Sequence, residues 1–310
     1  MSRIDILLAA MVVIWAVNYS LVKQAFAEIA PMPFNVLRFT LASAVFLGGM
    51  HWVARQRRRS RHLNATLHTA VAPTRRDWRG LVWLGLIGHC GYHLLWATGL
   101  SMTTASNSAL IMGASPVVAS TTAALLGHER IRPLHWGGIF GSLLGVMVVV
   151  GPAASLSGAT FTGDALTLGA VGCWTYLTIA GSRLMLRHSP LFVSGVTTTV
   201  GTLAYVILAI PSLDDVPWGS LGTRVWVVAA FSGLLSVAAG SVIWYAVVQR
   251  VGVARAAVYS NLVPLVAVFF AAYLVHESLT PLKLTGAGLV LAGVALTRLA
   301  REAPAAPLEE

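Results

Sequence analysis

Two stretches of this sequence, HERIRPLHWGG at 128–138 and HESLTPLKLTG at 276–286, share one pattern at positions 148 residues apart. Each has a His-Glu pair, a proline four residues after the glutamate and a glycine five residues after the proline. The match extends without a gap over 76–148 and 224–296, where 20 of 73 positions are identical. This self-similarity predicts a chain built from two copies of one unit.

The rest of the chain is far more apolar than a soluble protein. Of its 310 residues, 56% are hydrophobic and 10% are charged, and the mean hydropathy is +0.75. A bilayer core about 30 Å thick takes roughly 20 helical residues to cross, so this length accommodates ten crossings. The composition excludes a soluble globular protein and predicts an all-α integral membrane protein.

Ten stretches of low charge have the length of a membrane span. They lie at 6–22, 33–53, 81–100, 104–126, 134–152, 163–182, 190–211, 225–248, 253–275 and 282–297. The sequence therefore predicts two five-helix repeats, 1–152 and 163–301, with a cytoplasmic Arg-rich loop at 55–79 and a disordered tail at 302–310. Since five is odd, the second repeat is expected to be inverted relative to the first, a 5+5 arrangement.

The basic residues indicate the orientation. Of 21 Lys and Arg, 17 fall on one side of these spans and three on the other, and Arg38 lies within the second span. The positive-inside rule then places both termini in the cytoplasm, Glu129 on the cytoplasmic side and Glu277 outside, in a plasma membrane of the bacterial inner-membrane type. The positive charge is a topology signal, and the Arg-rich loop is expected to touch anionic lipid headgroups. We predict membrane lipid as a partner, no nucleic acid and no obligatory protein partner, a monomer being sufficient.

Four polar or aromatic residues in the third span share one helical face. His89, Tyr92, His93 and Trp96 follow offsets of 0, 3, 4 and 7, which align on one side of a helix. Such a face can stack on a planar substrate and hydrogen-bond to a carboxylate. Because ionisable groups in a membrane are costly and usually face a cavity, we favour substrate binding over interhelical hydrogen bonds that pin the bundle.

Other spans carry similar residues, which complete the predicted substrate site. Aromatic side chains near span ends usually anchor at the interface, but several of these lie deeper. The further candidates are Trp15, Asn18, Tyr19, Trp174, Thr178, Ser241, Trp244, Tyr245, Tyr259 and Asn261. Pro116 and Pro264 occupy matched positions near the middle of spans four and nine, where proline bends a helix, and are predicted to form paired kinks beside the cavity.

Three charged residues lie within or just past a span. Arg38 lies five residues inside the second span, deeper than Arg255 and Lys283 at the starts of the last two spans, and we expect it to snorkel to the outer interface or pair with Glu28, with binding of a substrate carboxylate as the alternative. Glu129 and Glu277, each just past a span, are predicted to cap and fix a hairpin, with a gate as the alternative.

Several functional classes lack the residues they need. The two cysteines, Cys90 and Cys173, lie in apolar runs, so no disulfide, metal site or cofactor is predicted. The sequence has no Gly-x4-Gly-Lys-Ser/Thr loop, which excludes ATP-driven pumping within this chain. No acid is assigned to a span, and no filter repeat or charge ring is present, so an intramembrane enzyme and a channel remain only as alternatives.

The repeat, with Trp15, Asn18 and Arg38 in the first two spans and the repeated Glu-x3-Pro and spaced-glycine pattern, resembles the ten-helix EamA branch of the drug/metabolite transporter superfamily. The resemblance covers nearly the whole chain. It implies secondary transport of a small-molecule substrate through a central cavity, and bacterial members of similar layout export amino acids or related metabolites. We therefore expect an exporter of small metabolites, most of all aromatic or apolar amino acids, that works by alternating access and is not an enzyme.

The same fold leaves a multidrug, nucleoside or other metabolite carrier as the alternative. In contrast to the small four-helix multidrug relatives, the first span has no acidic residue between Ile6 and Val22. Proton coupling would then have to use His89 or His93, whereas a facilitator would need no titratable group.

Overall fold

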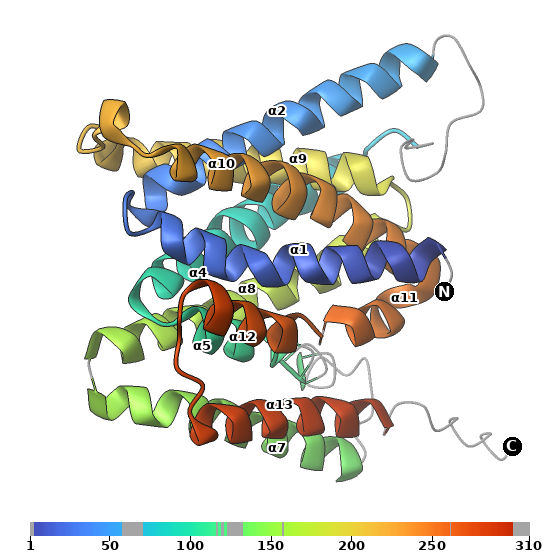
Figure 1. Cartoon of the computed structure of the whole chain (residues 1–310). Helices are drawn as coiled ribbons and strands as arrows, with labels where there is room; N and C mark the ends of the chain where they lie inside the picture. Colours follow the sequence, from blue (N-terminus) through green and yellow to red (C-terminus); the bar gives the residue numbers. More distant parts are fainter. Residues whose placement is uncertain are drawn as a thin grey trace, which may run out of the picture.

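The computed structural model describes residues 3–57, 71–115, 117–118, 121–122, 133–156, 158–260 and 262–299. These residues form helices and no strand (Figure 1), which confirms the all-α prediction. In chain order they are α1 (Arg3–Ala25), α2 (Pro31–Arg57), α3 (Arg75–Trp83), the π-helix η1 (Leu84–Gly91), α4 (Tyr92–Met102), α5 (Ala105–Met112), α7 (Pro133–Leu156), α8 (Gly158–Leu184), α9 (Pro190–Leu213), the 3₁₀-helix η2 (Trp218–Ser220), α10 (Thr223–Phe231), the π-helix η3 (Ser232–Ala239), α11 (Gly240–Ser260), α12 (Leu262–Leu274) and α13 (Pro281–Leu299).

Several of the predicted features fall outside these residues. They include Pro116, Glu129, Asn261, the tail 302–310 and residues 58–70 of the predicted Arg-rich loop. Both ends of that loop are helical instead, because α2 continues to Arg57 and α3 already begins at Arg75. The start of α1 and the end of α13 lie at the same end of the bundle (Figure 1).

Five helices of the described part are long and apolar enough to cross a membrane. They are 6–25, 31–56, 160–184, 190–213 and 223–250, and 136–148, 262–274 and 281–296 are shorter apolar helices. Large apolar side chains cover their outer faces, among them Met147, Ile207 and Phe269, each more than 60% exposed. Water disfavours such faces, whereas hydrocarbon accommodates them. The number of ten crossings stays a prediction.

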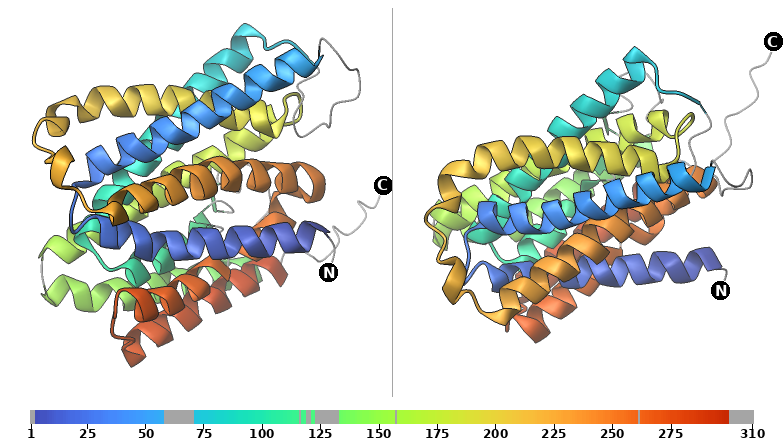
Figure 2. Two further views of the ribbon diagram at one scale, coloured as in Figure 1. Left: turned by 45° about the horizontal axis from the view of Figure 1, so that its top comes forward. Right: turned by 90° about the horizontal axis from the view of Figure 1, so that it is seen from above.

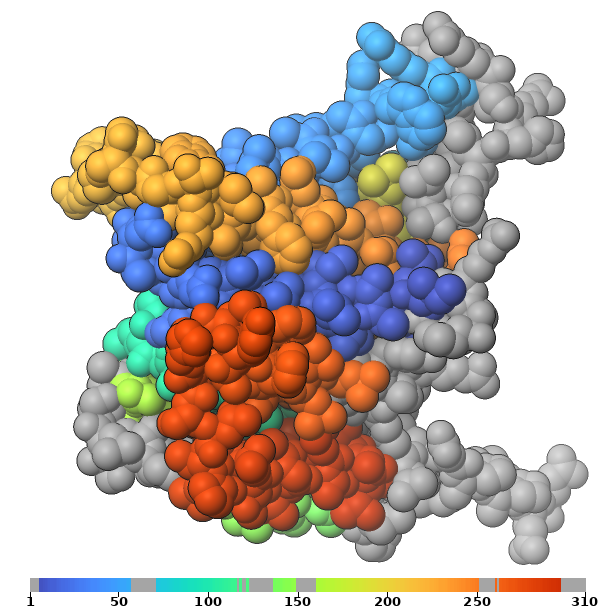
Figure 3. All heavy atoms as spheres, viewed as in Figure 1, coloured from blue at the N-terminus to red at the C-terminus, as the bar shows by residue number. Residues whose placement is uncertain are grey.

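Helix α1 lies in the middle of the bundle. It packs against α12 on one side and α10 and α11 on the other (Figure 3), although α10 begins 198 residues after α1 ends and α11 and α12 lie further still along the chain. Helices α2 and α9 lie side by side (Figure 2), and α7 pairs with α13. The buried side chains of the core clusters between these helices are mainly aliphatic.

The helix boundaries repeat with the spacing of the sequence match. The π-helix η1 spans 84–91 and the π-helix η3 spans 232–239, so η3 begins and ends 148 residues after η1. Helices α3 and α10 before them, and the starts of α4 and α11 after them, follow the same shift. A π-helix is rare and is found often at functional sites. The matched segments therefore share an uncommon backbone conformation as well as residues.

Matched glycines on α7 and α13 contact each other's helices reciprocally. A methyl group added at Gly145 would lie 2.6 Å from the backbone N of Val290 and 2.8 Å from the carbonyl O of Gly286. One added at Gly293 would fall on the backbone N of Ser142 and lie 2.5 Å from the carbonyl O of Gly138. The two backbones thus touch at equivalent positions, as two copies related by a two-fold axis do.

A capping box begins α3 at the edge of the bundle. The Thr74 backbone N–H and hydroxyl both donate to Asp77 Oδ2, at 2.9 and 2.8 Å, and the Thr74 hydroxyl accepts from the Asp77 backbone N–H. Hydrogen bonds from Thr74 lower the pKa of the Asp77 carboxyl to about 2, with help from His188 and Arg187. This carboxylate therefore joins the start of α3 to the turn between α8 and α9.

Candidate functional site

A cavity of about 120 Å³ lies between helices from both halves of the chain. Its walls come from α1, α2, η1, α4 and α5 in the first half and from α8, η3, α11 and α12 in the second. A buried water needs roughly 10–15 Å³ of such space, so the cavity can hold a small organic molecule. Nine of the predicted substrate-binding residues line it: Trp15, Asn18, Tyr19, His89, Tyr92, His93, Trp96, Trp174 and Ser241.

Three indoles form a cluster at one wall. The ring centroid of Trp15 lies 5.6 Å from that of Trp174 and 5.9 Å from that of Trp244, and the latter two are 6.1 Å apart. Trp15 Nε1 donates to the carbonyl O of Ser236 at 3.0 Å, which joins α1 to η3. Edge-to-face and tilted rings at these distances attract one another. The cluster fixes a rigid aromatic wall built from both halves.

The predicted face of the third span forms an adjoining wall, where the ring centroid of Tyr92 lies 5.4 Å from that of Trp174 in the indole cluster. Tyr92 stacks on Trp96 with centroids 6.5 Å apart and contacts His93 at 4.5 Å, and Trp96 meets the edge of Tyr19 at 5.5 Å. His89, His93 and Phe39 contact one another, with ring centroids 4.7 Å apart for the two histidines and 4.9 and 4.6 Å from Phe39 to His89 and His93. The helical offsets therefore brought these side chains together on the cavity side, even though η1 departs from α-helical geometry.

Arg38 does not have the location that its favoured prediction gave it. It is 1% exposed and lines the cavity, so the expectation that it snorkels to the interface or pairs with Glu28 is wrong. Its Nη1 donates to the Ser232 hydroxyl at 2.8 Å and its Nη2 to His93 Nδ1 at 3.0 Å. Glu28 instead accepts from the backbone N–H of Gly222. The partners of Arg38 lie 55 and 194 residues away, a distance over which no sequence pattern links them.

Other predicted residues lie next to the cavity without lining it. Trp244 is buried in the indole cluster, and the Thr178 hydroxyl donates to the carbonyl O of Trp174 within α8. The Tyr245 hydroxyl donates to the carbonyl O of Leu177 at 3.5 Å. The side chain of Tyr259 lies outside the described residues. Pro264, by contrast, does line the cavity, near the start of α12.

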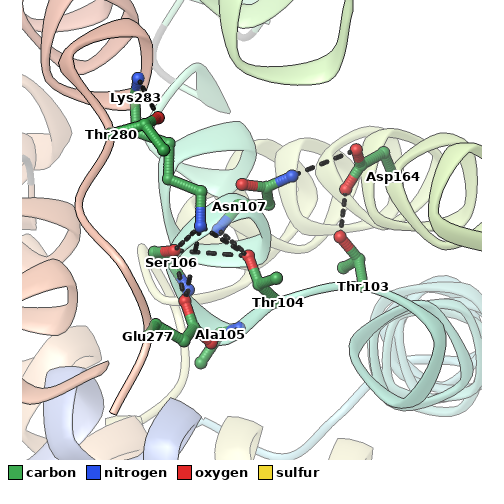
Figure 4. A network of polar contacts seen from close by, with 9 residues as sticks. All are labelled: Thr103, Thr104, Ala105, Ser106, Asn107, Asp164, Glu277, Thr280 and Lys283. Carbon is green, nitrogen blue, oxygen red and sulfur yellow. Dashed lines mark hydrogen bonds and ion pairs between the residues drawn. The ribbon is translucent and has the colours of Figure 1, made fainter. Parts of the chain in front are cut away.

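The statement that no acid lies within a span is also wrong. Asp164 is 1% exposed and lies near the start of the apolar helix 160–184. It accepts hydrogen bonds from the Thr103 hydroxyl and from Asn107 Nδ2 (Figure 4). These two donors explain how the buried carboxylate is tolerated, because a buried charge is costly unless hydrogen bonds replace its water. Asp164 lies outside the residues that line the cavity.

Glu277 joins the link between α12 and α13 to the start of α5. Its carboxylate accepts from the backbone N–H groups of Ala105 at 2.6 Å and Ser106 at 3.1 Å and from the Ser106 hydroxyl (Figure 4). Lys283 Nζ lies 3.8 Å from the carboxylate and donates to the Ser106 hydroxyl. The predicted capping role is thus seen on another helix, α5, where an anion also favours the positive end of the helix dipole.

Further polar contacts lie at the same end of the bundle. Lys23 Nζ donates to the carbonyl oxygens of Leu100 and Ser101, at the end of α4. Gln24 Nε2 donates to the carbonyl O of Leu274, at the end of α12. We call these contacts and those of Glu277 the Glu277 end. No group of three or more metal-ligating side chains occurs in the part of the chain that the structure describes.

A chain whose described residues form helices with apolar outer faces and a polar, aromatic cavity between its halves has the architecture of a membrane carrier. The model of the EamA-like transporter family matches residues 2–151 and 161–299. The chain therefore belongs to this family and is an integral membrane protein.

Similar proteins carry transporter names. The chain is 24% identical to an uncharacterized transporter of Bacillus subtilis, over 94% of this chain and 92% of that one. It is 28% identical to a "Probable amino-acid metabolite efflux pump" of Salmonella typhimurium (95% and 94% covered) and 29% identical to a "Probable terminal-alkyne amino-acid exporter" of Streptantibioticus cattleyicolor (72% and 74%). A solved crystal structure, 20% identical, matches with a TM-score of 0.65 over 97% of this chain and 100% of that one, which shows the shared fold.

Proposed function

We propose that this chain exports small metabolites, most of all amino acids with aromatic or apolar side chains, by alternating access through its central cavity. The observation that carries the proposal is the cavity between the two halves, with indole and imidazole groups on its walls. A substrate held between two halves can be exposed to either side when they rock against each other. The names of the Salmonella and Streptantibioticus relatives support amino acids as the substrate class.

The repeat supports two inverted five-helix halves. The shift of 148 residues between η1 and η3 and the reciprocal glycine contacts of α7 and α13 are what a two-fold relation between similar halves would produce. Inverted halves have two nearly equivalent packings, one open to each side of the membrane.

We further propose that the Glu277 end is the outer gate, closed in this structure. Glu277 and Lys283, from the second half, hold Ser106 on α5, from the first half. Opening the cavity to the outside would require these charge-assisted hydrogen bonds to break. By the repeat, Glu129 would have the same role at the cytoplasmic end.

A bulky residue in the cavity tests the proposed transport directly. Ser241 is a small cavity-lining residue, so Ser241→Phe fills space that a substrate would need. Val13→Phe adds a ring at a position that is 48% exposed on α1 and serves as the matched control. We expect proteoliposomes with the control to take up labelled aromatic amino acids like the unmodified protein, and those with Ser241→Phe to lose uptake.

Competition with unlabelled amino acids, nucleosides and quaternary amines would identify the substrate class. If nucleosides or quaternary amines compete more strongly than amino acids, the chain is a carrier of those compounds and not an amino-acid exporter. Equal uptake by the two phenylalanine variants would contradict the assignment of the cavity as the pathway.

Cysteine labelling tests the inverted topology. In a background without Cys90 and Cys173, we expect Arg130→Cys to react from the cytoplasm and Ser278→Cys from outside. Labelling of both cysteines from one side would exclude the inverted arrangement and, with it, alternating access between the two halves.

A further inference from the structure

The central cavity contains a buried positive charge, the guanidinium of Arg38. None of the described residues forms an ion pair with it. No acidic residue is found among the described residues that line the cavity. An unpaired charge in a membrane interior is costly, so a protein that maintains one there usually has a use for it.

Much of the hydrogen-bonding capacity of this guanidinium is unused. Of the five N–H groups of an arginine, one meets the Ser232 hydroxyl and one meets His93 Nδ1. Nε is buried and has no partner among the described residues. The Cζ atom lies 4.8 Å from the ring centroid of Phe39 and 5.2 Å from that of Trp96, so aromatic faces provide the remaining stabilisation.

Arg38 also fixes the state of His93. Because a guanidinium only donates, Nδ1 of His93 has to be the acceptor in their 3.0 Å contact. The proton of the neutral imidazole then lies on Nε2, which has no partner in the described part of the chain and is available as a donor. His93 is more exposed than Arg38 and lines the cavity, so its Nε2–H can donate a hydrogen bond to a ligand there.

Two further polar atoms of the described cavity wall are buried without a partner. His89 Nε2 donates or accepts according to its tautomer, and Asn18 Oδ1 accepts. Arg38 Nε and His93 Nε2–H can only donate, and Arg38 brings a positive charge. These groups are complementary to one that accepts hydrogen bonds and carries a negative charge.

From this arrangement we propose that the cavity recognises its substrate by a carboxylate, held by Arg38 and by the Nε2–H of His93, while the indoles of Trp15 and Trp174 hold a flat or apolar body. This deepens the proposed function and rests on it for the identity of the ligand as a transported substrate. A zwitterionic amino acid fits with its ammonium near Asn18 Oδ1, and an organic acid without an ammonium fits as well. An amine that lacks a carboxylate would meet the charge of Arg38 uncompensated, so it is excluded.

Three ligands with the same ring separate these cases. L-phenylalanine has a carboxylate and an ammonium, 3-phenylpropionate has the carboxylate alone, and phenethylamine has the ammonium alone. Binding to the purified full chain is measured through tryptophan fluorescence, because Trp15, Trp96 and Trp174 line the cavity. We expect both carboxylates to bind at least tenfold more tightly than phenethylamine, since a hydrogen bond to a charged group is worth about a factor of ten or more in affinity.

Variants then assign the effect to Arg38. We expect Arg38→Gln to weaken both carboxylates at least tenfold and Arg38→Lys, which keeps the charge without the planar fork, to weaken them less. Ser232→Ala removes a neutral partner of Arg38, keeps the charge, and is expected to change the affinities little. Thermal unfolding shows whether each variant is folded. If Arg38→Gln does not fold, the affinities of the unmodified protein for the three ligands test the proposal.

Any of three results would overturn the proposal. Phenethylamine could bind as tightly as 3-phenylpropionate, or neither carboxylate could bind at all. The third is a folded Arg38→Gln variant that binds the carboxylates as tightly as the unmodified protein. Uptake into proteoliposomes is measured separately. Arg38-dependent binding of carboxylates without uptake of any compound would remove the proposed transport and keep the site. Uptake that is indifferent to the carboxylate would keep transport and remove the site.

Discussion

The contact between α7 and α13 gives a quantitative prediction, because two glycines there have backbone atoms where a methyl group would lie. In Gly293→Ala the new methyl would lie 2.5 Å from the carbonyl O of Gly138, whereas ordinary van der Waals contact begins at 3.4 Å. The two helices must then separate by roughly 0.9 Å, the difference between these distances. Gly288 on the same helix has nothing within 4 Å, so Gly288→Ala is the matched control.

Overpacking of this kind costs about 1–3 kcal/mol. Both variants replace a helical glycine with alanine, so the gain in helix propensity of about 1 kcal/mol applies to both and cancels. We therefore expect the two variants to differ by about 1–3 kcal/mol in free energy of unfolding, or roughly 2–5 °C in melting temperature, with Gly293→Ala the less stable.

Thermal unfolding of the purified protein in detergent is the assay. The matched pair on α7 is Gly145→Ala, where the methyl would lie 2.6 Å from the backbone N of Val290, and Gly137→Ala, which again has nothing within 4 Å. We expect it to behave like the pair on α13, because the contacts are reciprocal. Equal melting temperatures for Gly293→Ala and Gly288→Ala would refute the close backbone approach, and a large effect on only one helix would refute the reciprocity.

Three further predictions concern charged and titratable groups. Replacing His89 and His93 together with glutamine should flatten any pH dependence of transport in proteoliposomes, and a dependence that persists would show that both histidines are structural. Glu277→Gln keeps one acceptor for α5 but loses the charge, so reagents added from outside should label a cysteine at Ser241 faster, and unchanged labelling would argue against an outer gate. The pKa of Asp77 is lowered to about 2, so its stabilising contribution is complete above the usual carboxyl pKa near 4 and is lost as the pH falls from about 4 to 2. Asp77→Asn should remove that part of the acid sensitivity of unfolding, and identical acid profiles for both proteins would contradict the role of the capping box.

The local properties of the sequence were enough for the fold class and much of the site. Composition predicted an all-helical membrane protein, and the repeat at 128–138 and 276–286 predicted matched halves. Helical spacing placed His89, Tyr92, His93 and Trp96 on one face, and that face does line the cavity. These features depend on periodicity and polarity, which a sequence records directly.

The tertiary structure alone decided which side chains meet across the bundle. Arg38 looked like an interface residue, but packing of α2 against η3 and α4 places it between Ser232 and His93. Glu277 looked like the cap of its own hairpin, but its carboxylate lies at the start of α5, which is 172 residues away from it. Such partners depend on how the helices pack. Helix packing is set by the shape of whole helix surfaces and by close approach at small residues, which no local spacing along the chain records.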